Sequence, residues 1–251
     1  MKQLKMNRHI LALVAVLVLG VIFQSHNAPG NRHSTSDLGD AFSSPSVTEA
    51  LPNLQGDKAI KQLKQSGEYD SLAAALTAAR YRVEEHEGEL VANNPANQMR
   101  ASFDATGVQL QSAKGEKWRT KWRLQSLGYG TNQKQTANGT LQSNENRTEL
   151  RRDELGLIEW YKNTPAGLEH GFEVESKPDA ETNSEPLRLV LKTEGDLIAQ
   201  ADADGNGLTM SDKRGATLRY ENLKVWDANK QGLTARMRTA QIGRASCRER
   251  V

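Results

Sequence analysis

The sequence predicts a mainly β protein whose body is an antiparallel, sandwich-like domain. Apolar and polar residues alternate along several short segments, which is typical of strands with one buried and one solvated face. Turn-forming pairs such as Asp204-Gly205 and Asn206-Gly207 separate these segments. Short strands with turn signals between them favour a sandwich or a related meander.

Residues 1–28 are predicted to be a signal peptide or a membrane anchor helix. Three basic residues precede an uncharged apolar run over residues 10–23, ILALVAVLVLGVIF. A basic start and a short apolar run are typical of a secretory signal, whereas a spanning helix needs about 20 residues. We prefer this interpretation to a buried helix, and both a cleaved signal and an uncleaved anchor fit. The protein is therefore expected to be exported, secreted or held at the cell surface or in the periplasm, and to touch the membrane only through this segment.

Two further segments separate the apolar run from the β body. Residues 29–56 are rich in Ser, Asn, Gly and Pro without a sustained period, which predicts a disordered spacer. Residues 57–80 carry apolar residues at helical spacing, which predicts short helices. Gly67 divides these helices, and Asp70 and Ser71 are the expected N-terminal cap of the second.

The predicted antiparallel β module covers residues 81–241. Its alternating segments are 99–103, 118–124, 172–174 and 187–191, with Val190 interrupting the polar side of the last. We expect Trp118 and Trp122 to lie in the core, on one face of a strand. The polar segment 129–146 is expected to be a mobile loop.

The last ten residues, 242–251, read as a translated sequencing adapter. We interpret them as an artefactual tail and expect the chain to be a fragment of a longer protein, with its β domain incomplete. Cys247, the single cysteine, lies in this tail, which leaves no disulfide framework. Without the tail and residues 1–28, 27 basic and 30 acidic residues remain, a net charge of about −3 instead of +2. This body lacks the concentrated positive charge of a nucleic-acid-binding protein.

Several segments of the β module resemble a module of large exported bacterial proteins. The most specific is 159–172, EWYKNTPAGLEHGF, and the others are 81–103, 122–130, 185–197 and 215–237. In proteins that this chain resembles, the module precedes FG-GAP repeats, the units of integrin-α-like β-propellers, or other extracellular repeats. The resemblance implies a non-catalytic extracellular or cell-surface module that supports a downstream repeat region of the same chain, in adhesion or scaffolding. It supplies no active-site residues.

Two other functions remain open on the sequence. The chain can be an accessory module of a secreted carbohydrate-active enzyme, or a membrane-anchored structural stalk. Trp160 and Tyr161 are adjacent, so one of the two is expected to face outward if they lie on a strand. They are the candidate binding residues for an extracellular protein or a glycan.

A weak calcium candidate lies at Asp202, Asp204 and Asn206, which are spaced like the start of a calcium loop. Position twelve of that loop is Lys213, a cation, and Asp-Gly and Asn-Gly also predict a hairpin turn. We therefore prefer the hairpin and assign no metal site.

No catalytic motif is found in the sequence. A nucleophile elbow, a phosphate loop, a zinc motif and a dinucleotide fingerprint are all missing. The adjacent carboxylates of Asp153 and Glu154 do not supply the geometry of a glycosidase pair. His170 is expected to make a structural hydrogen bond near Glu169. The chain is therefore predicted not to be an enzyme and to need no cofactor.

Overall fold

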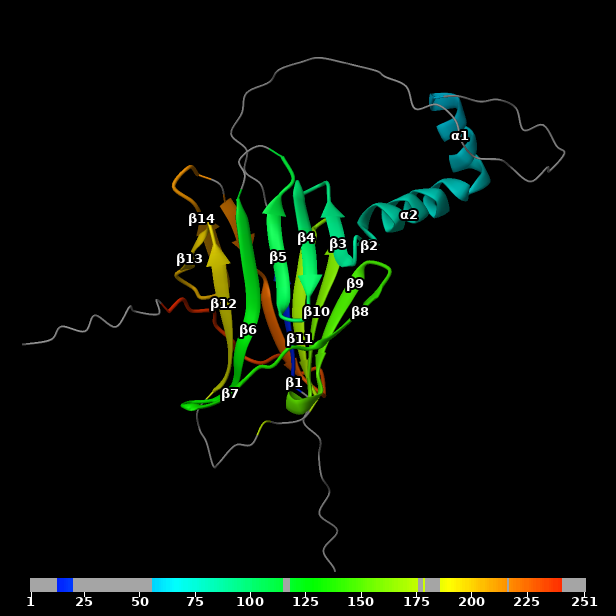
Figure 1. Cartoon of the computed structure of the whole chain (residues 1–251). Helices are drawn as coiled ribbons and strands as arrows, with labels where there is room; N and C mark the ends of the chain where they lie inside the picture. The colour runs from blue at the N-terminus through cyan, green and yellow to red at the C-terminus, as the bar shows by residue number, and fades with distance from the viewer. Residues whose placement is uncertain are drawn as a thin grey trace, which may run out of the picture. The chain divides into compact units, whose positions relative to one another are not determined.

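The computed structural model describes residues 13–19, 56–114, 118–175, 178, 186–215 and 217–240. The chain divides into two compact units, which we name the helical unit (residues 24–77) and the β unit (residues 1–23 and 78–251). The strands of the β unit are antiparallel and form sheets that enclose one apolar core (Figure 1). The prediction of a mainly β, sandwich-like domain is confirmed.

Two helices lie in the segment for which helices were predicted, α1 (Asp57–Ser66) and α2 (Glu68–Tyr81). Gly67 ends α1 in the left-handed conformation, with a φ of 77°, and its N–H donates to the carbonyl of Leu63. Because this glycine turns the chain directly into α2, the second helix begins earlier than expected. Asp70 and Ser71 lie inside its first turn, so the predicted cap is wrong.

One sheet has the strand order β16–β1–β11–β10–β9–β8, and we call it the hairpin sheet after its β10–β11 hairpin. Its strands are β1 (Leu13–Leu19), β8 (Thr140–Asn144), β9 (Arg147–Arg152), β10 (Leu157–Thr164), β11 (Gly167–Val174) and β16 (Leu223–Asp227). A single turn of 3-10 helix, η1 (Asp153–Leu155), joins β9 to β10.

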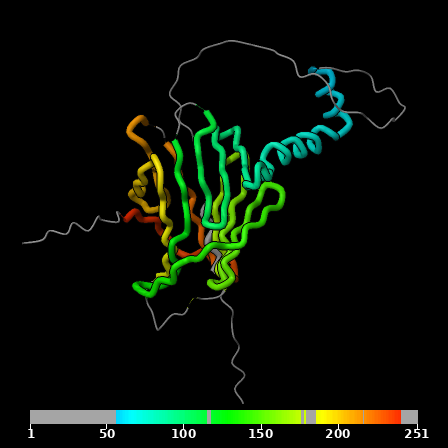
Figure 2. Tube along the Cα trace, viewed as in Figure 1, coloured from blue at the N-terminus to red at the C-terminus, as the bar shows by residue number. Residues whose placement is uncertain are grey.

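The facing sheet has the order β12–β6–β5–β4–β3–β2, with β7 also paired to β6, and we call it the meander sheet. Its strands are β2 (Val83–His86), β3 (Glu89–Asn94), β4 (Met99–Asp104), β5 (Gly107–Ser112), β6 (Arg119–Tyr129), β7 (Asn132–Gln135) and β12 (Leu187–Gly195). Figure 2 follows the chain through these successive hairpins.

A third, small sheet is formed by β13 (Ile198–Ala201), β14 (Leu208–Ser211) and β15 (Thr217–Tyr220). It contributes Met210, Leu218 and Tyr220 to the common core. The rings of Tyr220 and Trp122 lie 4.8 Å apart, so this sheet packs against β6.

Side-chain burial confirms that the alternating segments have one face in the core. Trp118, Trp122 and Leu124 are almost fully buried on one face of the meander sheet. The ring of Phe103 from β4 lies 5.3 Å from that of Tyr161 from β10, which joins the two large sheets. Burial of such side chains contributes roughly 1.5–3 kcal/mol each, which explains why the alternating segments form strands.

The expectation of a mobile loop over residues 129–146 is wrong. This segment contains β7, which pairs with β6, and β8, which pairs with β9. Both strands lie at sheet edges and are mostly exposed. An edge strand of this kind needs no apolar face, so its polar composition does not distinguish it from a loop.

The expectation of a helix in the apolar N-terminal run does not hold for its described part. Leu13–Leu19 forms β1, inside the hairpin sheet between β11 and β16. Its sequence, LVAVLVL, is rich in β-branched valine and apolar at every position, which suits a strand in a sheet interior. Within the described ranges, no helix is both long and apolar enough to cross a membrane. The rest of residues 1–28, the spacer before Gly56 and the tail 242–251 lie outside the described residues.

Buried asparagines connect the two large sheets at one end. Asn163 of β10 donates to the carbonyls of Tyr81 (3.0 Å) and Asn93 (2.9 Å), and its own side-chain oxygen accepts from Asn94 at 2.8 Å. Asn97 donates to the side-chain oxygen of Asn94 at 2.9 Å. These bonds satisfy polar groups that would be costly to bury alone, and they fix the β3–β4 turn against β10.

Candidate functional site

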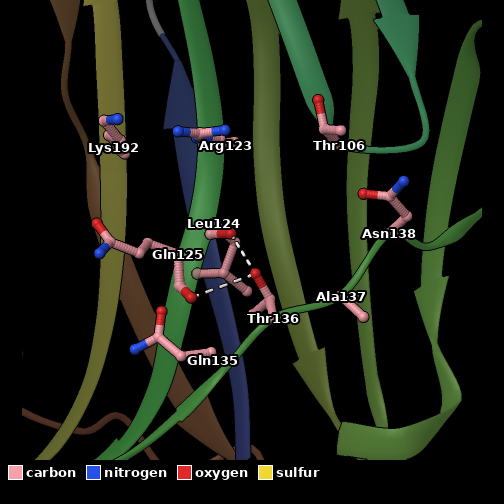
Figure 3. A pocket seen from close by; sticks show the side chains of 9 residues that line it. All are labelled: Thr106, Arg123, Leu124, Gln125, Gln135, Thr136, Ala137, Asn138 and Lys192. Atoms are coloured by element: carbon pink, nitrogen blue, oxygen red, sulfur yellow. Dashed lines mark hydrogen bonds between the residues drawn. The ribbon is translucent and has the colours of Figure 1, made fainter.

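A polar pocket of about 320 Å³ lies beside β6 and β12 of the meander sheet. Figure 3 shows its lining residues, which are Thr106, Arg123, Leu124, Gln125, Gln135, Thr136, Ala137, Asn138 and Lys192. Hydroxyl, amide and cationic groups predominate, and no aromatic ring is among these residues. A ligand here would be held by hydrogen bonds and charge instead of stacking.

A β-bulge positions the pocket. The pairing of β12 with β6 shifts between Val190 and Leu191, so that Gln125 has no partner residue across the sheet. The carbonyl of Gln125 instead accepts from the backbone N–H of Thr136 at 2.9 Å, and the Thr136 hydroxyl also donates to the carbonyl of Leu124. Bulges redirect side chains and are frequent beside functional sites.

The far wall of the pocket is held by one buried arginine. Arg152 Nε donates to the carbonyl of Ala137 at 3.2 Å, and its Nη2 donates to the carbonyl of Thr106 at 3.3 Å. The N–H of Gly139 adds a bond to the carbonyl of Ala105 at 2.8 Å. Both segments of this wall are therefore fixed before any ligand arrives.

Positive charge exceeds negative charge at the pocket. Arg123 Nη2 lies 3.2 Å and Lys192 Nζ 2.6 Å from the same oxygen of Glu194, which is half exposed. The hydrogen bond from Lys192, with the charges of Lys192 and Arg123, holds the pKa of Glu194 below its usual value. Two cations share one carboxylate, so one positive charge is left to meet an anionic group.

A second polar constellation is sealed in the core, around Glu159 of β10, and we call it the Glu159 cluster. Arg152 Nη1 donates to Glu159 Oε2 at 2.6 Å, and the Tyr161 hydroxyl donates to Oε1 at 2.6 Å. His170 Nε2 lies 3.0 Å from the same Oε1, and its Nδ1 lies 3.2 Å from the hydroxyl of Tyr220. None of these five side chains is more than about 4 % exposed.

Hydrogen bonds and charges within the Glu159 cluster shift the pKa values of its members. Burial alone would raise the pKa of Glu159, but the hydrogen bond and charge of His170, the charge of Arg152 and the Tyr161 hydroxyl outweigh it, and the pKa is lowered. Burial and the Glu159 charge raise the pKa values of Tyr161 and Tyr220 well above normal. Near neutral pH, Glu159 therefore stays ionised and the two tyrosines stay protonated. Groups that keep one protonation state are better suited to a structural role than to proton transfer.

We predict that the Glu159 cluster makes the fold acid-sensitive. Because the folded-state pKa of Glu159 lies below the ordinary value of 4.5, its contribution to stability is complete above that value and is lost as the pH falls through the folded-state pKa. Urea unfolding from about pH 7 to about pH 3 measures this loss. In Glu159→Gln this component of the pH dependence should vanish; an unchanged acid profile would contradict the assignment.

The candidate binding residues Trp160 and Tyr161 lie on opposite faces of β10. Tyr161 is in the core, where its ring stacks on His170 at 4.4 Å. Trp160 is on the outer face but only 6 % exposed, because the guanidinium of Arg147 lies 4.4 Å over its ring. Arg147 is held there by Glu149 (2.7 Å) and Glu173 (3.1 Å). A ligand could stack on Trp160 only if Arg147 moved away.

The calcium candidate forms the turn between β13 and β14. Both oxygens of Asp202 face Arg219, at 2.8 and 3.3 Å, and Asp204 accepts from the N–H of Asn206 at 2.9 Å. A guanidinium thus faces the carboxylate on which calcium binding would depend. Among the residues that the structure describes, no group of three His, Cys, Asp or Glu side chains is placed to hold a metal.

Sequence reasoning missed the Glu159 cluster. His170 was expected to bond in a turn near Glu169, but it lies in β11 and contacts Glu159. A signal was present in the spacing of β10, because Glu159 lies two residues from both Leu157 and Tyr161 and therefore on the same face of the strand as these two buried residues. The 159–172 segment forms most of the β10–β11 hairpin, in which Glu159 lies opposite Phe172.

Comparison with known proteins adds no relative. No protein-family model, no curated protein and no solved structure matches the chain.

Proposed function

We propose that this chain is a non-catalytic module that works outside the cytoplasm, where it docks or spaces a repeat region of the same polypeptide in adhesion or scaffolding. The observation that carries the proposal is the sealed Glu159 cluster. The chain's most specific sequence segment, 159–172, contributes its acid and histidine to that cluster and not to an open cleft.

The charge distribution supports the same proposal. Ionisable groups outside the core form exposed pairs, such as Arg151 with Glu175 at 3.3 Å and with Asp153 at 3.7 Å. Such pairs solvate a surface and contribute little stability. A rigid sandwich with a sealed interior and a charged surface suits a spacer between other domains.

Export is tested by protease accessibility of intact bacterial cells that express the full chain. We expect the β unit to be digested or released, while a variant with Leu11→Arg and Ala12→Arg in the apolar run, outside β1, remains protected inside. Protection of the unaltered chain would contradict export.

The non-catalytic role has a test of its own. Turnover of a substrate by the purified protein, lost in Glu159→Gln, would contradict that role.

We propose glycan binding at the polar pocket as the second candidate, in line with an accessory module of a carbohydrate-active enzyme. The amides of Gln125, Gln135 and Asn138 suit sugar hydroxyls, and Arg123 and Lys192 suit a carboxylate or sulfate. The fixed pocket wall lowers the entropic cost of binding. An acidic oligosaccharide is therefore the ligand class that this pocket favours.

We predict that a double variant, Arg123→Gln with Lys192→Gln, weakens binding to acidic oligosaccharides at least about tenfold, because charge-assisted hydrogen bonds of roughly 1.5–3 kcal/mol each are removed. A glycan array followed by titration at two salt concentrations measures this, and salt should weaken binding by the unaltered protein. Lys162→Gln with Lys224→Gln, which removes two exposed cations of the hairpin sheet, is the matched control. Loss in Trp160→Ala with full binding by the pocket variant would contradict the pocket.

A further inference from the structure

The first strand of the β unit is inserted between two distant parts of the chain. β1 pairs antiparallel with β11 over seven residues, from Leu13 opposite Val174 to Leu19 opposite Leu168. On its other side it pairs with β16 over five residues, from Leu13 opposite Asp227. Consecutive strands usually pair with each other, but β1 is more than 140 residues from either partner. The position it fills is therefore formed entirely by other segments.

Leaving this position empty would be energetically unfavourable. Without β1, the β11 edge would expose a row of unpaired backbone N–H and C=O groups beside the core residues Leu168, Phe172 and Val174. β16 would also lose its ladder, because within the described part of the chain β1 is its one strand partner. We call the position between β11 and β16 the acceptor slot.

The strand in the acceptor slot has a distinctive composition. The strand that fills it is apolar at all seven positions, without proline or charge. The same strand belongs to the run that the sequence predicts to be an export signal, and one segment cannot lie in a membrane and in this sheet together. Withdrawal or removal of that segment would open the slot.

We propose that the acceptor slot is a strand-binding site, occupied by Leu13–Leu19 of the same chain and able to take an apolar strand in trans when that segment is withdrawn. The partner is an uncharged, proline-free strand of about seven residues, antiparallel to β11 and β16. Such strand addition obtains affinity from the main-chain ladder and specificity from the side chains that enter the core. This inference holds whether or not the module functions in adhesion.

Occupancy by β1 is tested by thiol trapping in the full chain, with Cys247→Ser to remove its single thiol. Val14→Cys with Glu173→Cys places two thiols opposite each other in the register. A short bifunctional thiol reagent should link them within a monomer. Val14→Cys with Glu169→Cys is the matched control, because the pair is offset by four residues, roughly 13 Å. Absence of the register-specific link would overturn occupancy of the slot by β1.

Acceptance in trans is tested with a full chain that carries a protease site in the 24–55 segment. After cleavage, a fluorescent peptide of residues 10–23 with terminal lysines should exchange into the slot and bind at least about tenfold more tightly than its Val16→Pro version, which cannot complete the ladder. No binding of the peptide by the cleaved protein would overturn the proposal. Equal binding of both peptides would also overturn it, because this would be unspecific apolar adhesion.

Discussion

Arg152→Ala is expected to destabilise the protein by about 3–5 kcal/mol, the largest effect that we predict for a single substitution. The substitution leaves the Glu159 carboxylate, which has no exposed surface, without its guanidinium partner at 2.6 Å. It also releases the carbonyls of Ala137 and Thr106 that form the pocket wall. Urea unfolding followed by tryptophan fluorescence measures the loss.

The neighbouring Arg151 provides a matched control for this prediction. Its guanidinium lies on the outer face, 3.3 Å from Glu175 and 3.7 Å from Asp153, and exposed pairs of this kind contribute about 0–1 kcal/mol. Arg152→Met with Glu159→Leu should recover part of the lost stability, because it removes the orphaned charge. Equal losses of stability in Arg151→Ala and Arg152→Ala would show that the buried Arg152–Glu159 pair contributes no more than an exposed pair.

Gly171→Ala is expected to destabilise the protein by about 1–3 kcal/mol through overpacking. A Cβ at this position would lie 2.3 Å from Cε2 and Cζ2 of the Trp160 ring, which Arg147 covers from 4.4 Å. Since the ring is covered by the guanidinium, it cannot easily make room. Thermal or urea unfolding measures the effect. Glycine is needed at position 171 because it lies opposite Trp160 in the β10–β11 hairpin, where the ring occupies the space of a side chain.

Two variants separate overpacking from a general intolerance of alanine. Gly232→Ala meets no atom within 4 Å and should change stability by no more than about 0.5 kcal/mol. Trp160→Leu should make Gly171→Ala less costly, because a smaller side chain leaves room for the added methyl group. If the two substitutions were additive, contact between residues 160 and 171 would not be the cause.

The strands that the sequence predicted are those whose burial is one-sided. Trp118, Trp122 and Leu124 alternate with polar residues, and this pattern alone determines which face meets the core. β7 and β8 were missed because edge strands bury little, and β1 because a strand that is apolar throughout has no period of two. Local sequence carries the pattern only when the two faces of a strand differ.

The sites were harder to predict because their partners come from other strands. Trp160 resembles a surface aromatic in the sequence, but Arg147 of β9 covers it. Glu159 is neutralised by Arg152 of β9 and bonded by His170 of β11. The pocket likewise combines β6, β12 and the segment after β7. Such contacts depend on strand pairing, which a single sequence does not specify.

The antiparallel register of β1 and β16 has a mechanical consequence. Leu13 lies opposite Asp227, so the segment that precedes β1 and the segment that follows β16 leave the sheet at the same end of the ladder. Tension between these two segments loads the hydrogen bonds one pair at a time, as in opening a zipper, and does not shear them together. A pulling force would therefore peel β16 from β1 at low load, while strands β8 to β11 of the same sheet remain paired.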